Sequence, residues 1–159
     1  MKLDRIDREI LKCLQQDGRL TNIELAKKVG LSASPCLRRV KALEEQGVVY
    51  GYRALVEPKA LGFQLMALIH ISMDQHTQER FENFEKTVQH IPQVMECLLI
   101  TGQQADYQLK VIVADMDAFQ DLLLNQITRI RGVTGVHTSF VLRRVIDRTS
   151  VPLDLQGDD

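Results

Sequence analysis

The chain has 159 residues, a formal net charge of −1 and 45% hydrophobic residues, which is ordinary for a soluble globular protein of one or two small domains. It has no apolar run long enough to cross a bilayer and no signal-peptide core, so we expect a cytoplasmic protein with no membrane partner. Cys13, Cys36 and Cys97 form no ligand cluster, which predicts buried thiols and no metal site or disulfide framework.

The first predicted helix lies within residues 3–18, which read LDRIDREILKCLQQDG. Asp4 or Asp7 lies near its start and Gly18 at its end, as helix-terminal signals require. The predicted apolar face consists of Ile6, Ile10, Leu11 and Leu14.

A second helix is predicted to begin at Thr21. Thr21 and Glu24 have the S/T-x-x-E spacing of a capping box, which satisfies unpaired amides at a helix start. Gly30 follows where a left-handed residue is needed to end the helix. The predicted apolar face consists of Ile23, Leu25, Ala26 and Val29.

A third helix is predicted to run to Gln46, with Gly47 ending it. Either Ser32 or Ser34 can cap its start, and Pro35 is tolerated because first-turn amides have no intrahelical partner. The residues predicted to face a core recur at a spacing of three and are Leu37, Val40 and Leu43.

The opposite face of this third helix carries Ser34, Arg38 and Lys41. Guanidinium groups can contact phosphates or the acceptor pair on guanine, and hydroxyls can hold phosphate oxygens. A basic helix face alone is more often solvated surface, but a preceding helix and a glycine-containing turn form a DNA-reading helix-turn-helix. The residues predicted to contact DNA are Thr21, Asn22, Ser32, Ser34, Pro35, Arg38, Arg39 and Lys41.

The segment after Gly47 reads VVYGYRALVEP and alternates apolar and polar residues around Gly51. This pattern predicts a short two-stranded wing. We therefore expect a winged helix-turn-helix domain over residues 1–57 and a hinge over residues 58–63.

We expect residues 64–159 to form a second domain, and six further elements are predicted from residue 63 onward. In chain order they are a strand in 63–74, a helix in 78–91, strands in 94–102 and 107–114, a helix in 115–130 and a strand in 133–145. This order is that of the ferredoxin-like βαββαβ fold. Such a sheet carries both helices on one face, so a second copy covering the other face makes a homodimer the expected minimum assembly. The acidic tail LDLQGDD, residues 153–159, is expected to be frayed.

These motifs resemble the leucine-responsive regulatory protein and asparagine-synthesis regulator (Lrp/AsnC) family of bacterial and archaeal transcription factors. The resemblance covers nearly the whole chain and rests on LDRIDREIL, DGRLTNIELAKKVGLS, SPCLRRVKALEEQGVVYGY, a later glycine turn ending in DY, and a DM at a helix start. It implies an α+β chain whose ferredoxin-like domain binds an effector and forms dimers, tetramers or octamers. Two reading helices on one dimer imply a pseudo-palindromic DNA operator.

Residues 101–107 read TGQQADY, a glycine turn between two strands. Its amides could hold a carboxylate and Asp106 could pair with an amino group, as an amino acid requires; a plain hairpin is the alternative. The family resemblance implies an amino acid effector beside this loop, although the loop is one residue longer than the family's G-x-x-D-Y. The residues predicted to line the effector site are Thr101, Gly102, Gln103, Gln104, Ala105, Asp106, Tyr107, Met116, Thr138 and Ser139.

Charge is divided unevenly along the chain. Residues 1–60 hold twelve Lys or Arg against eight Asp or Glu, a net +4, whereas residues 61–159 hold eight against thirteen, a net −5. This asymmetry supports a basic DNA-facing module carried by an acidic module. The chain has no catalytic or cofactor-binding motif, so we expect no enzyme and no cofactor besides the non-covalent amino acid. We predict a sequence-specific, nucleoid-associated transcriptional regulator; the alternative is an architectural DNA-binding or amino-acid-sensing scaffold protein.

Overall fold

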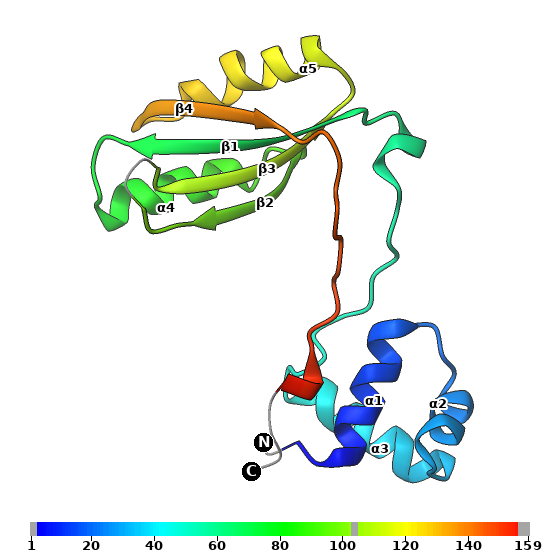
Figure 1. Ribbon diagram of the computed structural model, residues 1–159. Coiled ribbons are helices and arrows are strands. Elements are labelled where there is room, and N and C mark those ends of the chain that lie inside the picture. The colour runs from blue at the N-terminus through cyan, green and yellow to red at the C-terminus, as the bar shows by residue number, and fades with distance from the viewer. Residues whose placement is uncertain (1–2, 103–104, 156–159) are drawn as a thin grey trace. The chain divides into compact units, whose positions relative to one another are not determined.

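The structure is a computed structural model that describes residues 3–102 and 105–155. The chain divides into two compact units, each with its own core. The first unit comprises Met1–Leu55 together with Ile146–Asp159, and the second comprises Val56–Val145. Figure 1 shows that the first is helical and the second is a sheet with helices, which confirms the expected α+β class.

The first unit contains the three predicted helices, and their N-terminal caps explain where two of them begin. Asp4 and Asp7 form a reciprocal capping box at the start of the first helix, and Thr21 and Glu24 form another at the start of the second. Gly30 ends the second helix in the left-handed conformation, with φ 71°. The helices are α1 (Arg5–Gln16), α2 (Asn22–Val29) and α3 (Ala33–Glu45).

The helices of this unit enclose a core in which Ile10, Cys36 and Leu43 are fully buried. The prediction that Ile23 and Leu37 face the core is wrong, because Ile23 is 73% exposed and Leu37 is 43% exposed. The buried stripe of α3 runs through Cys36, Val40 and Leu43 instead. Because a helix has 3.6 residues per turn, a pattern read at a spacing of three drifts around it and missed the buried position at 36.

The predicted strands of the wing are absent from the segment 46–57, all of which is described. The amides of Val48 and Val49 both donate to the carbonyl of Leu43, at 2.9 and 3.1 Å, and so close the end of α3. The Tyr52 hydroxyl donates to Glu44 at 2.9 Å. Contacts with α3 therefore occupy the segment that alternation assigned to a hairpin.

Residues 151–154 contact α1, so the described beginning of the acidic tail is not frayed as expected; residues 156–159 of that tail lie outside the described residues. The side-chain amide of Gln15 both donates to and accepts from the backbone of Val151, and Arg8 donates to the carbonyl of Leu153 at 3.1 Å. Lys12 pairs with Asp154. Residues from Ile146 therefore group with the helical unit, whereas we expected residues 64–159 to form one domain.

The second unit has the predicted order of strands and helices, and a short 3₁₀ turn (Pro58–Leu61) precedes it in the expected hinge. Its four strands are antiparallel to their neighbours in the order β2-β3-β1-β4, which confirms the ferredoxin-like arrangement. Asp115 caps α5 as predicted. A π-helical turn (Leu122–Gln126) and a 3₁₀ turn (Ile127–Arg129) continue that helix. The elements are β1 (Leu65–Met73), α4 (Gln78–Val88), β2 (Val94–Leu99), β3 (Tyr107–Val113), α5 (Met116–Asp121) and β4 (Val133–Phe140).

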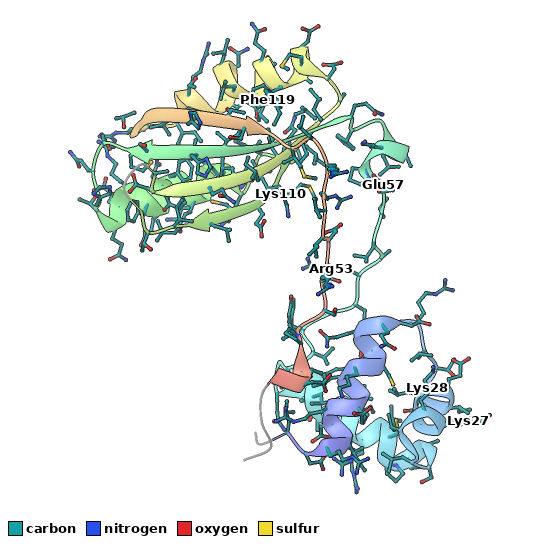
Figure 2. The ribbon with its side chains drawn as sticks, viewed as in Figure 1. Lys27, Lys28, Arg53, Glu57, Lys110 and Phe119 are labelled. Carbon is teal, nitrogen blue, oxygen red and sulfur yellow. The ribbon has the colours of Figure 1, made fainter. Side chains whose placement is uncertain are left out.

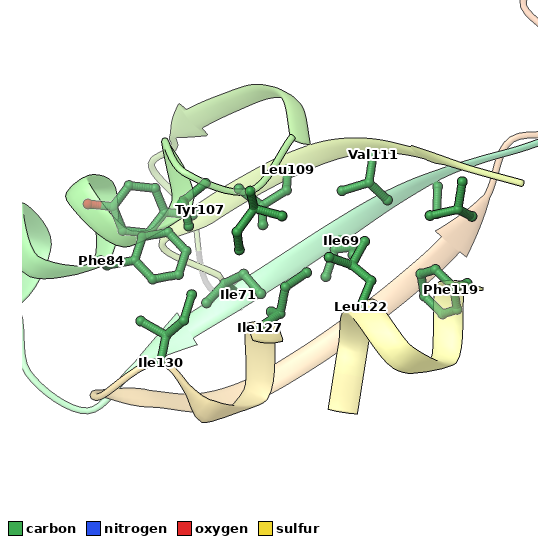
Figure 3. Close-up of a cluster of buried hydrophobic side chains, with 14 of the residues drawn as sticks. Ile69, Ile71, Phe84, Tyr107, Leu109, Val111, Phe119, Leu122, Ile127 and Ile130 are labelled. Carbon is green, nitrogen blue, oxygen red and sulfur yellow. The ribbon is translucent and has the colours of Figure 1, made fainter. Parts of the chain in front are cut away.

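Both helices of this unit cover one face of the sheet. Alternate residues of β1 and β3 point to this face and are buried, as strand geometry requires. They meet Phe84 from α4, and Phe119 and Leu122 from the α5 region (Figure 3). The strand residues in this core are Ala67, Ile69, Ile71, Met73, Tyr107, Leu109, Val111 and Val113. Among the described residues of this unit, no helix lies over the other face of the sheet.

Candidate DNA-binding face and effector loop

The exposed face of α3 carries Ser34, Arg38 and Lys41, as predicted. These residues lie at i, i+4 and i+7 and therefore share one side of the helix. Arg38 has no hydrogen bond or ion pair with any residue in the described part of the chain. Its guanidinium is thus available to a ligand outside the unit.

The side chain of the neighbouring Arg39 points toward the start of α1, although we predicted that it contacts DNA. Its Nη1 atom lies 2.6 Å from an oxygen of Asp4 and 2.8 Å from an oxygen of Asp7, so it ties α3 to α1. Asp7 is only 7% exposed. The backbone amide of Asp7 and, after it, the guanidinium of Arg39 lower the pKa of Asp4. Arg39 therefore serves the packing of the helices.

Several of the other predicted DNA contacts shape the turn before α3. Thr21 is engaged with Glu24, whose carboxylate accepts from the Thr21 amide and hydroxyl at 2.8 Å each. Asn22 donates to the carbonyl of Ala33 at 2.8 Å and so joins α2 to α3. Ser32 is the N-cap of α3, but its side chain makes no capping hydrogen bond.

Pro35 is half-buried in the first turn of α3, where its lack of an amide hydrogen costs nothing. The lysines Lys27 and Lys28 of α2 are further basic residues of this unit and were not predicted as contacts. Both are exposed in the last turn of that helix (Figure 2). Their adjacency in the sequence was the signal that could have identified them.

The loop between β2 and β3 is held by Asp106. One carboxylate oxygen of Asp106 accepts from the amide of Met73 at 2.7 Å, and the other lies 2.7 Å from Nε2 of His76. Its backbone amide donates to Ile71, and its carbonyl accepts from Ile100, at 2.8 Å each. The carboxylate predicted to receive an amino group thus already bridges the loop to the end of β1.

The rest of the loop is divided between exposed and buried residues. Thr101 and Gly102 are exposed, Ala105 is half-buried, and the predicted Gln103 and Gln104 lie outside the described residues. Tyr107 is 1% exposed. Its ring packs against Phe84 with centroids 4.5 Å apart, and its hydroxyl donates to Glu85 at 2.8 Å. Burial and the Glu85 charge raise the pKa of Tyr107.

The remaining predicted effector residues lie away from this loop within one chain. Tyr107 begins β3 and Met116 follows its end, so the seven residues of the strand, about 3.3 Å each, separate them. Thr138 and Ser139 lie on β4, which β1 separates from β3. Thr138 pairs with Ile69 on the helix-covered face, whereas Ser139 lies on the open face. Within one copy, Met116, Thr138 and Ser139 therefore do not lie beside the loop.

A groove that we did not predict runs between α4 and the edge strand β2. It encloses about 370 Å³ and is lined by Glu85, Met95, Cys97 and Leu99, among others. Cys97 is exposed and Cys13 is half-buried, so only Cys36 matches the expectation of buried thiols. Cys97 nevertheless lines the groove, where partial desolvation of the thiol and, after it, the charge of Glu85 raise the pKa of Cys97 to about 11. Its position on an edge strand explains its exposure.

Across residues 3–102 and 105–155, no group of three or more His, Cys, Asp or Glu side chains is placed to hold a metal ion. Within the same residues, no helix has the length and apolar character needed to cross a membrane.

Comparison with known families agrees with this geometry. Residues 3–50 match the winged helix-turn-helix DNA-binding family, and residues 66–151 match the Lrp/AsnC ligand binding domain. The leucine-responsive regulatory protein of Escherichia coli K12 is 44% identical over 143 residues, which make up 90% of this chain and 87% of that protein. The winged class of the first unit is thus supported, although residues 46–57 form no strand pair.

Two solved structures are also similar over nearly their full length. A transcriptional regulator from Neisseria meningitidis in complex with L-methionine has a TM-score of 0.91 and 40% identity, covering 96% of this chain and 98% of that one. The feast or famine regulatory protein from M. tuberculosis, complexed with L-methionine, has a TM-score of 0.84 and 34% identity, covering 93% and 97%. Such relatives are regulators of transcription and not enzymes, as expected for this chain.

Proposed function

We propose that this chain, which belongs to the Lrp/AsnC family of transcriptional regulators, binds a two-fold symmetric operator as a homodimer or larger assembly under the control of an amino acid. The observation that carries this proposal is the exposed basic face of α3 on a unit whose sequence continues into an Lrp/AsnC ligand-binding domain. Binding to chromosomal DNA would place the protein on the nucleoid.

In this proposal, Arg38 and Lys41 contact the major groove while Ser34 and Ser32 hold phosphate oxygens. Ser32 suits that role because it sits at the start of α3, where helix amides also point outward. Lys27 and Lys28 add positive charge beside the turn. We assign Arg39 and Asn22 to holding α1, α2 and α3 together rather than to the DNA contact predicted for them, because their side chains are bound within the unit.

We infer that dimers form through the open face of the sheet. Leu68 and Met66 lie there half-buried, and Leu98 is 43% exposed. The face also carries His70, which lies 3.2 Å from the side-chain oxygen of Gln108. A second copy of the same face would cover these side chains, and the resulting pair of α3 helices would match a pseudo-palindromic operator. Tetramers or octamers would be built from such dimers.

We propose that the effector is a free amino acid bound beside the loop 101–107. The two relatives bound to L-methionine support an amino acid of this size. Thr101, Gly102 and the loop amides would hold its carboxylate, while Asp106 keeps the loop closed on β1. Because Met116, Thr138 and Ser139 lie elsewhere in one copy, they would reach the ligand only from a neighbouring copy.

An electrophoretic shift assay at fixed salt tests the proposal, with DNA from upstream of the protein's own gene and random DNA of equal length. A specific regulator should prefer the upstream DNA, and Arg38→Ala should weaken that binding by about 1–3 kcal/mol. Equal affinity for both DNAs would favour the architectural scaffold.

A thermal-shift screen of the common amino acids, with L-methionine and L-leucine first, should find a ligand that raises the melting temperature. If none does so, the effector proposal fails.

A further inference from the structure

Leu37 is an apolar side chain on a helix face that is otherwise polar and basic. It lies one turn from both Ser34 and Lys41 and next to Arg38 in the sequence. Its exposed fraction is 43%, and it is not among the residues that pack on the buried cluster of this unit. The core therefore does not account for a leucine at this position.

The packing of α3 fixes this orientation. Cys36 and Leu43 are fully buried, and Arg39 is held by the carboxylates of Asp4 and Asp7 at the start of α1. A rotation of α3 that buried Leu37 would break both sets of contacts. Leu37 is thus presented on the same side as Arg38 before any DNA is bound.

We propose that Leu37 is a specificity-determining residue that contacts the C5-methyl group of a thymine in the major groove. This inference rests on the proposed function, because it requires α3 to lie in that groove. The thymine methyl is the apolar feature of the major-groove base edges, and apolar side chains read it by contact. The basic neighbours Arg38 and Lys41 make nucleic acid, rather than an apolar protein surface, the occupant that fits this face.

Deoxyuridine substitution tests the contact, because it removes only the methyl group from a thymine. Each thymine of a footprinted operator is replaced in turn, symmetrically in both half-sites, and affinity is measured at one salt concentration. We expect one position at which the wild type loses about fourfold per half-site, the factor that corresponds to ~0.8 kcal/mol for one buried methyl-sized group. Leu37→Ala should bind the thymine operator more weakly and show no further loss at that deoxyuridine position.

The controls separate this contact from a general loss of binding. Ile23→Ala removes a more exposed apolar side chain from α2 and should keep the wild-type sensitivity to deoxyuridine. Arg38→Ala should also keep it while binding more weakly overall. Circular dichroism and thermal melting should show that Leu37→Ala folds normally, because its side chain lies outside the core.

Two outcomes would overturn the inference. Either no deoxyuridine position weakens the wild type, or Leu37→Ala loses as much as the wild type at the sensitive position. Both results leave the proposed function standing if the wild type still prefers its operator to random DNA. Loss of that preference would instead refute the proposed function itself.

Discussion

Replacement of Arg38 and Arg39 by alanine, one at a time, should produce opposite phenotypes. The two side chains are adjacent in the sequence, but Arg38 is exposed while Arg39 binds Asp4 and Asp7. Arg38→Ala should reduce DNA affinity and leave stability within about 0.5 kcal/mol of the wild type, as for surface substitutions in general. Arg39→Ala should lower the stability of the helical unit.

The magnitude for Arg39→Ala follows from its two partners. The pair with Asp4 is half exposed and is worth about 0.2–1 kcal/mol. The side chain of Asp7 is only 10% exposed, and loss of one partner of a buried pair costs about 3–5 kcal/mol. Arg39 itself is 32% exposed, and Asp7 still accepts from the Asp4 amide. Solvent screening therefore reduces the expected total to roughly 2 kcal/mol.

Urea unfolding followed by circular dichroism at 222 nm, together with hydrogen exchange of α1 and α3, measures this difference. Arg39→Ala should accelerate exchange in both helices while leaving the sheet unit unchanged. Adding Asp7→Asn should recover part of the loss, since an amide is less costly than a carboxylate to leave buried without its cation. If Arg39→Ala keeps wild-type stability and loses only DNA affinity, the assignment of Arg39 to helix packing is wrong.

Three further predictions concern other contacts. Truncation after Arg148 removes the tail contacts with α1 and should lower the melting temperature of the helical unit alone; hydrogen exchange of α1 unchanged from the wild type would contradict this. Tyr107→Phe removes the bond to Glu85 and should cost the sheet unit about 1 kcal/mol in urea unfolding without changing amino acid affinity, whereas a large affinity loss would mean that the hydroxyl contacts the ligand. Alkylation of Cys97, followed by peptide mapping, should be slow at pH 8 and rise until about pH 11, because the thiolate forms only near its raised pKa. Glu85→Gln should shift that rise to lower pH, and an unchanged profile would exclude the charge as a cause.

Local patterns predicted much of this fold because their causes are local. The capping box of Thr21 and Glu24 spans one helical turn, and Gly30 is explained by the left-handed backbone conformation at that one position. The alternation of β1 likewise follows from strand geometry alone. The order of elements then restricted the topology to the observed sheet.

The predictions differed from the structure where contacts between residues distant in the sequence determine the position of a side chain or segment. Nothing near Arg39 in the sequence shows that the carboxylates of Asp4 and Asp7, over thirty positions away, lie beside it. The packing of the tail was missed for the same reason, because Val151 is hydrogen-bonded to Gln15, which lies 136 residues away in the sequence. The absent wing strands show the converse, since residues 48–52 alternate in the sequence but their groups contact α3.

The position of α3 links these observations to DNA binding. Cys36 and Leu43 fix one side of the helix in the core, and Arg39 fixes a second side on α1. These constraints leave Leu37 and Arg38 facing outward, so the reading face is set by folding and not by the DNA. Affinity is then gained without the cost of ordering this helix on binding. Arg39→Ala should consequently reduce the affinity for DNA only to the extent that it unfolds the helical unit. Osmolytes that restore folding of this variant should therefore restore its DNA binding.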